Sequence, residues 1–231
     1  MMKVVKCLIA CVLCGFLGVN AVYAQYDFCE RAPSGQMLYY QVIHYPPTRL
    51  LIQIVPSVRV THPEKEWPYY SDNKPVGDLV IPEKVTFEGR EYAVVEVGEY
   101  AFYRCDSLTG VLGQSVWNVR YQAFCGCTVL KNIMLGTHFL DKKGAYLYCV
   151  SIGEGAFAYC RSLERLYLPE SVSGIGISAF SMCQGLEEVR MAPEVEKICD
   201  ATTFHGCSLM QDRKNRKIQS GEPFDAVVWS R

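Results

Sequence analysis

Near its centre the chain reads Ile152-Gly153-Glu154-Gly155-Ala156-Phe157-Ala158-Tyr159-Cys160-Arg161-Ser162-Leu163, the clearest of five copies of the pattern V-x-x-[VI]-G-x-x-A-F-x-x-C-x-x-L between Val94 and Leu209. The Phe position is filled, at spacings of 22, 33, 23 and 24 residues, by Phe102, Phe124, Phe157, Phe180 and Phe204. Three residues later every copy has a cysteine: Cys105, Cys127, Cys160, Cys183 and Cys207. A recurring period near 23 residues predicts a repeat solenoid, in which each unit stacks on the next.

A second pattern, L-x-x-[VIL]-x-[LM], follows the cysteine and is seen at 130–135, 163–168 and 186–191. Its last apolar positions alternate with variable ones, which is the periodicity of a strand. Pro169 and Pro193 end two of these strands, because proline has no N–H for pairing. The G-x-x-A-F-x-x-C half is too short for a long helix, so it predicts one or two helical turns or a tight turn, with Gly98, Gly153 and Gly176 letting the backbone bend.

These repeats resemble the BspA-like leucine-rich repeat, found in surface and secreted proteins of Bacteroidetes and of some parasites. The resemblance covers about residues 77–210, including the lead-in Gly77–Pro82 and the segment Val85–Tyr92, since such arrays often open with a similar hairpin. It implies a solenoid of short leucine-rich repeats with a parallel β-sheet. It also implies a non-catalytic role in adhesion or protein recognition at the cell surface.

The length of 231 residues and a hydrophobic content of 50% allow one repeat domain with a sizeable core. A formal net charge of −1 does not suggest a nucleic-acid-binding protein, which needs a clustered basic face. The basic run Arg213–Lys217 is expected to be a solvated tail or cap.

The first 24 residues have the features of a secretory signal peptide. Lys3 and Lys6 precede an apolar run from Cys7 to Val19, and cleavage after Ala24 would leave Gln25 as the mature start. The run is shorter than the ~20 residues of a spanning helix. Two alternatives remain, an N-terminal membrane anchor and acylation of Cys11 within Leu8-Ile9-Ala10-Cys11. After signal cleavage we expect no membrane span, and a location in the secreted fraction, the cell surface or the periplasm.

Residues 25–76 lack the repeat and predict a small β-rich N-terminal cap. Its expected strands are Met37–Ile43, Leu50–Val55 and Ser57–Thr61. A cap is needed because a solenoid leaves an apolar face bare at each end. Trp67, Tyr69 and Tyr70 either pack this cap against the first repeat or form an exposed aromatic site.

The array is expected to span 77–210 as five units, with an insertion at 139–149 between the second and third. Insertions in solenoids are loops, either neutral or at a binding face. Residues 211–231 are expected to form a C-terminal cap or tail, with a strand-like end at Phe224–Trp229.

Nine of the 12 cysteines remain after removal of the leader. Export favours disulfides, but a cysteine at one fixed repeat position is explained as a small buried residue. We therefore expect the column cysteines to be free, buried thiols, and no pairing follows from the sequence for Cys29, Cys125, Cys149 or Cys199.

Neither a cofactor nor a metal is expected. Cys125-Gly126-Cys127 has no histidine at a ligand spacing nearby, and the four histidines are scattered along the chain. No Gly-x-Ser-x-Gly, His-Glu-x-x-His or phosphate-loop motif occurs. Paired carboxylates among Glu164, Glu187 and Glu188 are the sole hint of hydrolytic chemistry, and charged strand surfaces are usually just solvated.

The repeated strand also predicts where a ligand would bind. Leu79, Val111, Ile133, Leu166 and Val189 are expected to point inward, and the residue after each to point outward. The outward column would be about 20 Å long at ~4.8 Å per strand. Its members, with Arg165 beside them, are the candidate partner-binding residues Val80, Leu112, Met134, Tyr167 and Arg190. The alternative is a cross-strand ladder that merely stabilises the sheet.

Three functions follow from these observations. The first is a binding or adhesion protein whose ligand is a host matrix protein or an envelope protein. The second is a structural component of a bacterial envelope complex. The third, an enzyme such as a protease or glycan hydrolase, has no motif to support it. The oligomeric state does not follow from the sequence.

Overall fold

The computed structural model describes residues 26–44, 56–64, 66–70, 73–136, 150–168, 170–208 and 218–219. The signal peptide, Cys11, the expected strand Leu50–Val55, the insertion 139–149, the basic run and Phe224–Trp229 lie outside these residues.

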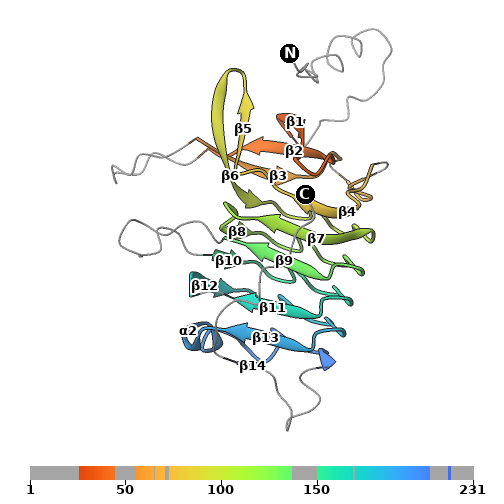
Figure 1. Ribbon diagram of the computed structural model, residues 1–231, viewed down its shortest axis with the longest axis vertical. Coiled ribbons are helices and arrows are strands. Elements are labelled where there is room, and N and C mark those ends of the chain that lie inside the picture. Colours follow the sequence, from red (N-terminus) through yellow and green to blue (C-terminus); the bar gives the residue numbers. More distant parts are fainter. Residues whose placement is uncertain are drawn as a thin grey trace.

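The described chain is a solenoid whose coils carry parallel strands on two sides, as Figure 1 shows. One side belongs to a sheet in the order β1-β2-β3-β6-β8-β10-β12, with β5 paired to β6. Its strands are β1 (Phe28–Arg31), β2 (Met37–Val42), β3 (Ser57–Thr61), β5 (Lys84–Phe87), β6 (Arg90–Val97), β8 (Asn118–Val119), β10 (Val150–Ile152) and β12 (Val172–Ile175).

The other side is made of two three-stranded parallel sheets. The first holds β4 (Gly77–Val80), β7 (Leu108–Gly113) and β9 (Asn132–Leu135), and the second holds β11 (Arg165–Leu168), β13 (Glu188–Met191) and β14 (Ile218–Gln219). The strands expected from the L-x-x-[VIL]-x-[LM] pattern are confirmed here. The strands β8, β10 and β12 come from the V-x-x-[VI] segment before the turn, which the sequence analysis had not assigned.

In the fifth unit the V-x-x-[VI] segment before the turn does not form a strand. It forms the single helical turn α2 (Pro193–Glu196). Proline at the first helical position needs no backbone partner there. Val195 remains fully buried, so the helix still supplies the apolar side chain that the other repeats supply from a strand.

The G-x-x-A-F-x-x-C half forms a tight turn, one of the two expected alternatives, and these turns bond to one another. The amide of Phe102 donates to the carbonyl of Ala123 at 2.7 Å, and that of Phe124 to Ala156 at 2.7 Å. The third and fourth repeats continue the series, since the Phe157 amide donates to Ala179 at 2.8 Å. Successive turns are therefore joined by backbone hydrogen bonds, as strands are in a sheet.

The phenylalanine column is a continuous stack. Neighbouring ring centroids lie 5.0, 5.0, 5.3 and 5.6 Å apart from Phe102 to Phe204, with interplanar angles of at most 16°. Every ring of the column is buried. The expected stacking of each unit on the next is confirmed, and the rings place one large apolar contact at each of these repeat boundaries.

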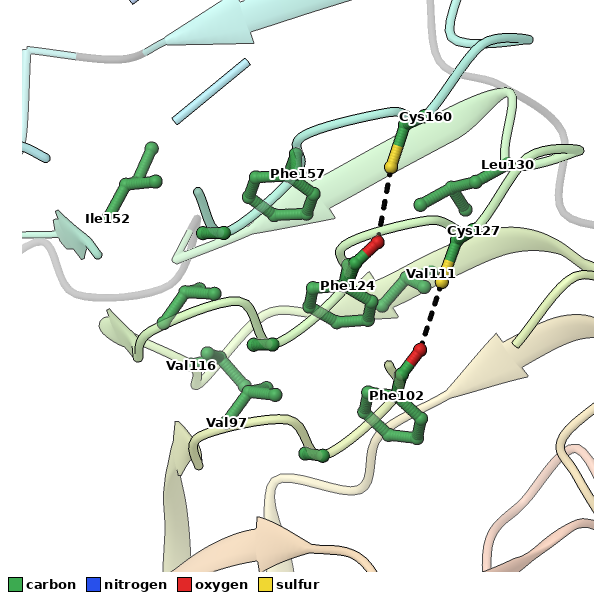
Figure 2. Close-up of a cluster of buried hydrophobic side chains, with 14 of the residues drawn as sticks. Val97, Phe102, Val111, Val116, Phe124, Cys127, Leu130, Ile152, Phe157 and Cys160 are labelled. Carbon is green, nitrogen blue, oxygen red and sulfur yellow. Dashed lines mark hydrogen bonds between the residues drawn. The ribbon is translucent and has the colours of Figure 1, made fainter. Parts of the chain in front are cut away.

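The cysteine column has a second role besides filling space. The Cys127 thiol donates to the carbonyl of Phe102 at 3.1 Å, and the Cys160 thiol to that of Phe124 at 3.3 Å (Figure 2). Cys183 and Cys207 repeat this bond to Phe157 and Phe180. A thiol is a weak donor that is small enough to be fully buried, so cysteine links each turn to the one before it.

All the cysteines that the structure describes are free thiols, as expected for the column. Burial raises the pKa of the Cys105 thiol to about 12 and also raises the pKa of Cys127 and Cys160. Since alkylation needs the thiolate, Cys105, Cys127 and Cys160 should not react with iodoacetamide at pH 8 in the folded protein. After unfolding in urea these three thiols should react readily.

Mass spectrometry of labelled peptides, taken before and after unfolding, measures this difference. Labelling of Cys160 in the folded state at the rate seen in urea would contradict a closed, stacked core.

The repeat glycines act differently from the expectation. Gly98, Gly153 and Gly176 are not among the residues with positive φ, so the turns that begin at them do not use, at these positions, the left-handed conformation that glycine allows. Instead, a Cβ on Gly153 would lie 2.7 Å from the carbonyl carbon of Arg120, and one on Gly176 would lie 2.4 Å from the amide nitrogen of Glu154. Glycine is needed at these two positions because the backbones of successive coils pass too close together for a side chain.

The N-terminal cap is part of the same sheet as the array. Strands β1, β2 and β3 are antiparallel, and β3 then pairs in parallel with β6. The expected strands Met37–Ile43 and Ser57–Thr61 correspond to β2 and β3, whereas β1 had not been expected. The hairpin implied by the family resemblance is present as β5 and β6.

A buried carboxylate fastens the cap to the first two repeats. Glu96 on β6 is only 4% exposed and pairs with Arg59 of β3 at 3.1 Å and with Arg120 at 2.9 Å. Asn118 donates to the same carboxylate at 2.7 Å. A buried charge is tolerated only when it is paired and hydrogen-bonded, and here its partners come from the two elements on either side of β6.

Candidate protein-binding face

The candidate residues lie on the side of the solenoid formed by the two three-stranded sheets. In the first sheet, Val80 pairs in register with Leu112, and Leu112 with Met134. In the second, Tyr167 pairs in register with Arg190. The order of strands β7, β9, β11 and β13 along this side is visible in Figure 1.

Burial distinguishes the two faces of these strands. Leu79, Val111, Leu166 and Val189 are all buried, at no more than 3% exposure. All five residues of the outward column are half-buried. We call these five residues the outer column: Val80, Leu112, Met134, Tyr167 and Arg190. Half-buried apolar side chains contact their neighbours along the column and still expose area to a ligand.

The outer column is interrupted, contrary to the expectation of one stripe about 20 Å long. Strands β9 and β11 belong to different sheets, so Met134 and Tyr167 are not in paired strands. The break falls within the spacing of 33 residues between Phe124 and Phe157, the longest spacing of the Phe column. A long ion pair of 3.8 Å between Lys131 and Glu164 spans the break at the surface.

A small apolar cavity of about 30 Å³ lies at this break. It is lined by residues of both sheets and of the core, and by Tyr167 of the outer column: Ile133, Leu135, Ile152, Phe157, Leu166, Tyr167, Leu168, Val172 and Phe180. Ile133, which was expected to point inward, lines this cavity and is half-buried. The inward direction of this strand position is kept, but its packing is looser than in the other repeats.

Charged and polar side chains flank the outer column. Arg190 pairs with Glu188 on the same strand at 3.0 Å, and Thr109 donates to Asp78 at 2.7 Å. Arg165 is exposed next to Glu164 at the start of β11. An apolar centre with a polar border is the usual anatomy of a protein-binding surface.

Some aromatic residues of the cap pack against the first repeat, and others are exposed, so both alternatives given by the sequence analysis occur. Tyr70 is buried, and its hydroxyl donates to the carbonyl of Ala101 at 2.7 Å, which packs the cap on the first repeat. Tyr69 stacks on Tyr100 with centroids 4.9 Å apart. Trp67 is 64% exposed. Tyr100, Tyr103 and Tyr121 were not considered in the sequence analysis, because they occupy variable positions of the repeat.

Among the residues that the structure describes, no group of three or more His, Cys, Asp or Glu side chains could hold a metal ion. In the same part of the chain, no helix has the length and apolar character needed to cross a membrane.

Comparison with known proteins shows to which family the repeats belong. The model of the BspA type leucine-rich repeat region matches residues 83–211 in six copies. No curated protein sequence matches the chain.

Similar solved structures include three bacterial leucine-rich repeat proteins. One from Bacteroides ovatus is 24% identical, with 72% of this chain and 43% of that chain covered and a TM-score of 0.42. One from Bacteroides capillosus is 28% identical, with 58% and 86% covered and a TM-score of 0.43. One from T. pallidum is 31% identical, with 65% and 68% covered and a TM-score of 0.40. The chain thus spans less than half the length of the first of these proteins, and it belongs to the BspA-type leucine-rich repeat family.

Proposed function

We propose that this protein is a non-catalytic binding module, exported by its leader to the cell surface or the secreted fraction, which holds a protein ligand on the outer column. The observation that carries the proposal is the alignment of Val80, Leu112 and Met134 in three paired strands, each half-buried rather than covered. Solenoids use such repeated strand positions as an extended binding platform.

Tyr167 and Met134 are the proposed anchors of the ligand, on the two sides of the break between the sheets. Aromatic and arginine side chains dominate many interfaces, and methionine adapts its shape to a partner. Arg190 and Arg165 lie at the edge, where they can pair with acidic groups of the ligand. This arrangement favours a ligand that crosses both three-stranded sheets.

The double change Met134→Ser with Tyr167→Ser tests this site. We expect the affinity for the ligand to fall by roughly thirtyfold or more, since anchor residues contribute about 2 kcal/mol or more. The wild-type protein is first used to capture partners from host extracellular matrix and from the envelope of the producing cell. The affinity of each variant for the captured protein is then measured by calorimetry.

The control is Tyr159→Ser with Ile177→Ser, which alters two exposed apolar residues on the turns, at 46% and 56% exposure. It should bind as the wild type does. Both variants must keep the circular dichroism spectrum of the folded solenoid. Undiminished binding by the folded Met134/Tyr167 variant would contradict the proposed site and would direct attention to the insertion at 139–149. Capture from the envelope alone would favour a structural role in an envelope complex over adhesion.

A further inference from the structure

The last boundary of the cysteine column differs from the boundaries before it. At each boundary a thiol donates to a carbonyl of the preceding turn, and the last two of these bonds run from Cys183 to Phe157 at 3.2 Å and from Cys207 to Phe180 at 3.1 Å. The thiols of Cys183 and Cys207 are in addition hydrogen-bonded to each other. None of the first three thiols of the column, all of which the structure describes, is hydrogen-bonded to another thiol.

The hydrogen bond between the two thiols makes one of them easier to ionise. It lowers the pKa of Cys207 and raises the pKa of Cys183. A thiol has one hydrogen, so when Cys207 loses its proton, the Cys183 hydrogen can turn from the Phe157 carbonyl to the new thiolate and stabilise it. Burial instead raises the pKa of each of the first three thiols of the column. Of the five column thiols, Cys207 is therefore the best nucleophile.

Cys207 is buried, but the fifth turn is held less firmly than the turns before it. The ring centroids of Phe180 and Phe204 are 5.6 Å apart, the widest spacing of the column. The amides of Phe180 and Met182 donate to the fifth turn at 3.0 and 2.7 Å, and among the described residues no backbone hydrogen bond joins this turn to a later segment. An end unit with one neighbour opens more readily than a central unit. Opening makes Cys207 accessible, and closing returns it to Cys183.

We propose that Cys183 and Cys207 form a redox-active pair that an external disulfide oxidises, so that a covalent bond joins the fourth and fifth turns. Export, as proposed above, favours the oxidised state, because disulfides persist outside the reducing cytosol. The bond would fix the end of the array, since a cross-link restricts the opened chain. The pair lies in the core, so the inference does not depend on the ligand of the outer column.

The oxidation takes two steps of thiol–disulfide exchange. The Cys207 thiolate attacks one sulfur of the external disulfide, which forms a mixed disulfide on Cys207 and releases one thiolate. Cys183 then gives up its proton and attacks the Cys207 sulfur, which closes the bond between the two residues and releases the second thiolate. The protein loses two electrons and two protons, and the external disulfide gains them and becomes two thiols. The second step joins sulfurs that already contact each other, and a disulfide brings them to about 2 Å.

Peptide mapping of the oxidised protein tests the inference. Oxidised glutathione is the probe, and it is added to the reduced, folded mature protein at pH 8. The protein is then digested with trypsin without reduction, and its peptides are identified by mass spectrometry. Trypsin separates the two cysteines, because Arg190 and Lys197 lie between them. We expect a cross-link between Cys183 and Cys207.

Three variants, each checked for folding by circular dichroism, separate the roles of the thiols. Cys183→Ala should stop at the mixed disulfide, with glutathione attached to Cys207. Cys207→Ala should give no cross-link and no glutathione on Cys183. Cys199→Ala removes the other cysteine of the same tryptic peptide and should leave the cross-link unchanged.

The matched control is the pair Cys127 and Cys160, which are neighbouring column thiols without a hydrogen bond between them, and both should stay free in the folded protein. Hydrogen exchange of the fifth-turn amides should slow by roughly tenfold or more on oxidation, because the cross-link opposes opening of the turn. Absence of the cross-link in the wild type, an equal yield of cross-link at Cys127 and Cys160, or loss of the cross-link in the Cys199 variant would each overturn the inference.

Discussion

Replacing Phe157 with alanine is expected to lower the free energy of unfolding by about 3–5 kcal/mol, the usual loss for a buried phenylalanine. Phe157 is 1% exposed and stacks on both sides, on Phe124 at 5.0 Å and on Phe180 at 5.3 Å. Its loss therefore removes contacts at two repeat boundaries. It would also enlarge the cavity that Phe157 already lines, and the backbone hydrogen bonds between neighbouring turns resist a collapse that would refill the space.

Phe204→Ala is the matched control, because it makes the same change at the last described ring of the stack. Phe204 has one stacked neighbour among the described rings, Phe180 at 5.6 Å, so its loss should cost less. Urea unfolding of both variants, followed by circular dichroism, gives the comparison. Small and equal losses at the two positions would contradict a core built on the phenylalanine stack.

Replacing Gly176 with alanine should destabilise the protein by about 3 kcal/mol or more, although it adds a single methyl group. The new Cβ would lie 2.4 Å from the amide nitrogen of Glu154 and 2.6 Å from the carbonyl carbon of Gly153. Backbone atoms cannot rotate away as the end of a side chain does. The third and fourth coils would have to separate, which would strain the 2.7 Å hydrogen bond from the Gly176 amide to Ile152.

Gly174→Ala provides the control two residues away, on strand β12, which ends just before Gly176. A Cβ there would contact only the Ser151 hydroxyl, at an ordinary 3.6 Å, and Gly174 does not have a positive φ. Its stability should stay within about 1 kcal/mol of the wild type. Thermal unfolding by calorimetry measures both variants. Equal unfolding temperatures for the two would show that the coils can separate at little cost, against the close backbone approach described here.

The sequence alone was sufficient for the core of the array. The Phe and Cys columns predict which side chains are buried, because a repeat places chemically equal residues at equal positions and stacking brings them together. The strands after each cysteine follow from their alternation, and so does the inward direction of Leu79, Val111, Leu166 and Val189. Each of these predictions depends on residues close together in the chain or related by the period.

The remaining features depend on how one coil lies against the next. Gly176 was expected to permit a bend, and its actual role is visible only once the Glu154 backbone is placed beside it. The break between Met134 and Tyr167 is visible only once β9 and β11 are found in different sheets. The ion pairs of Glu96 with Arg59 and Arg120 also could not be predicted, and neither could the ring contacts of Tyr100 with Tyr69 and Tyr121. These residues occupy variable positions, where the period carries no information, so their contacts are decided by the docking of the cap and by the spacing between coils in the folded solenoid.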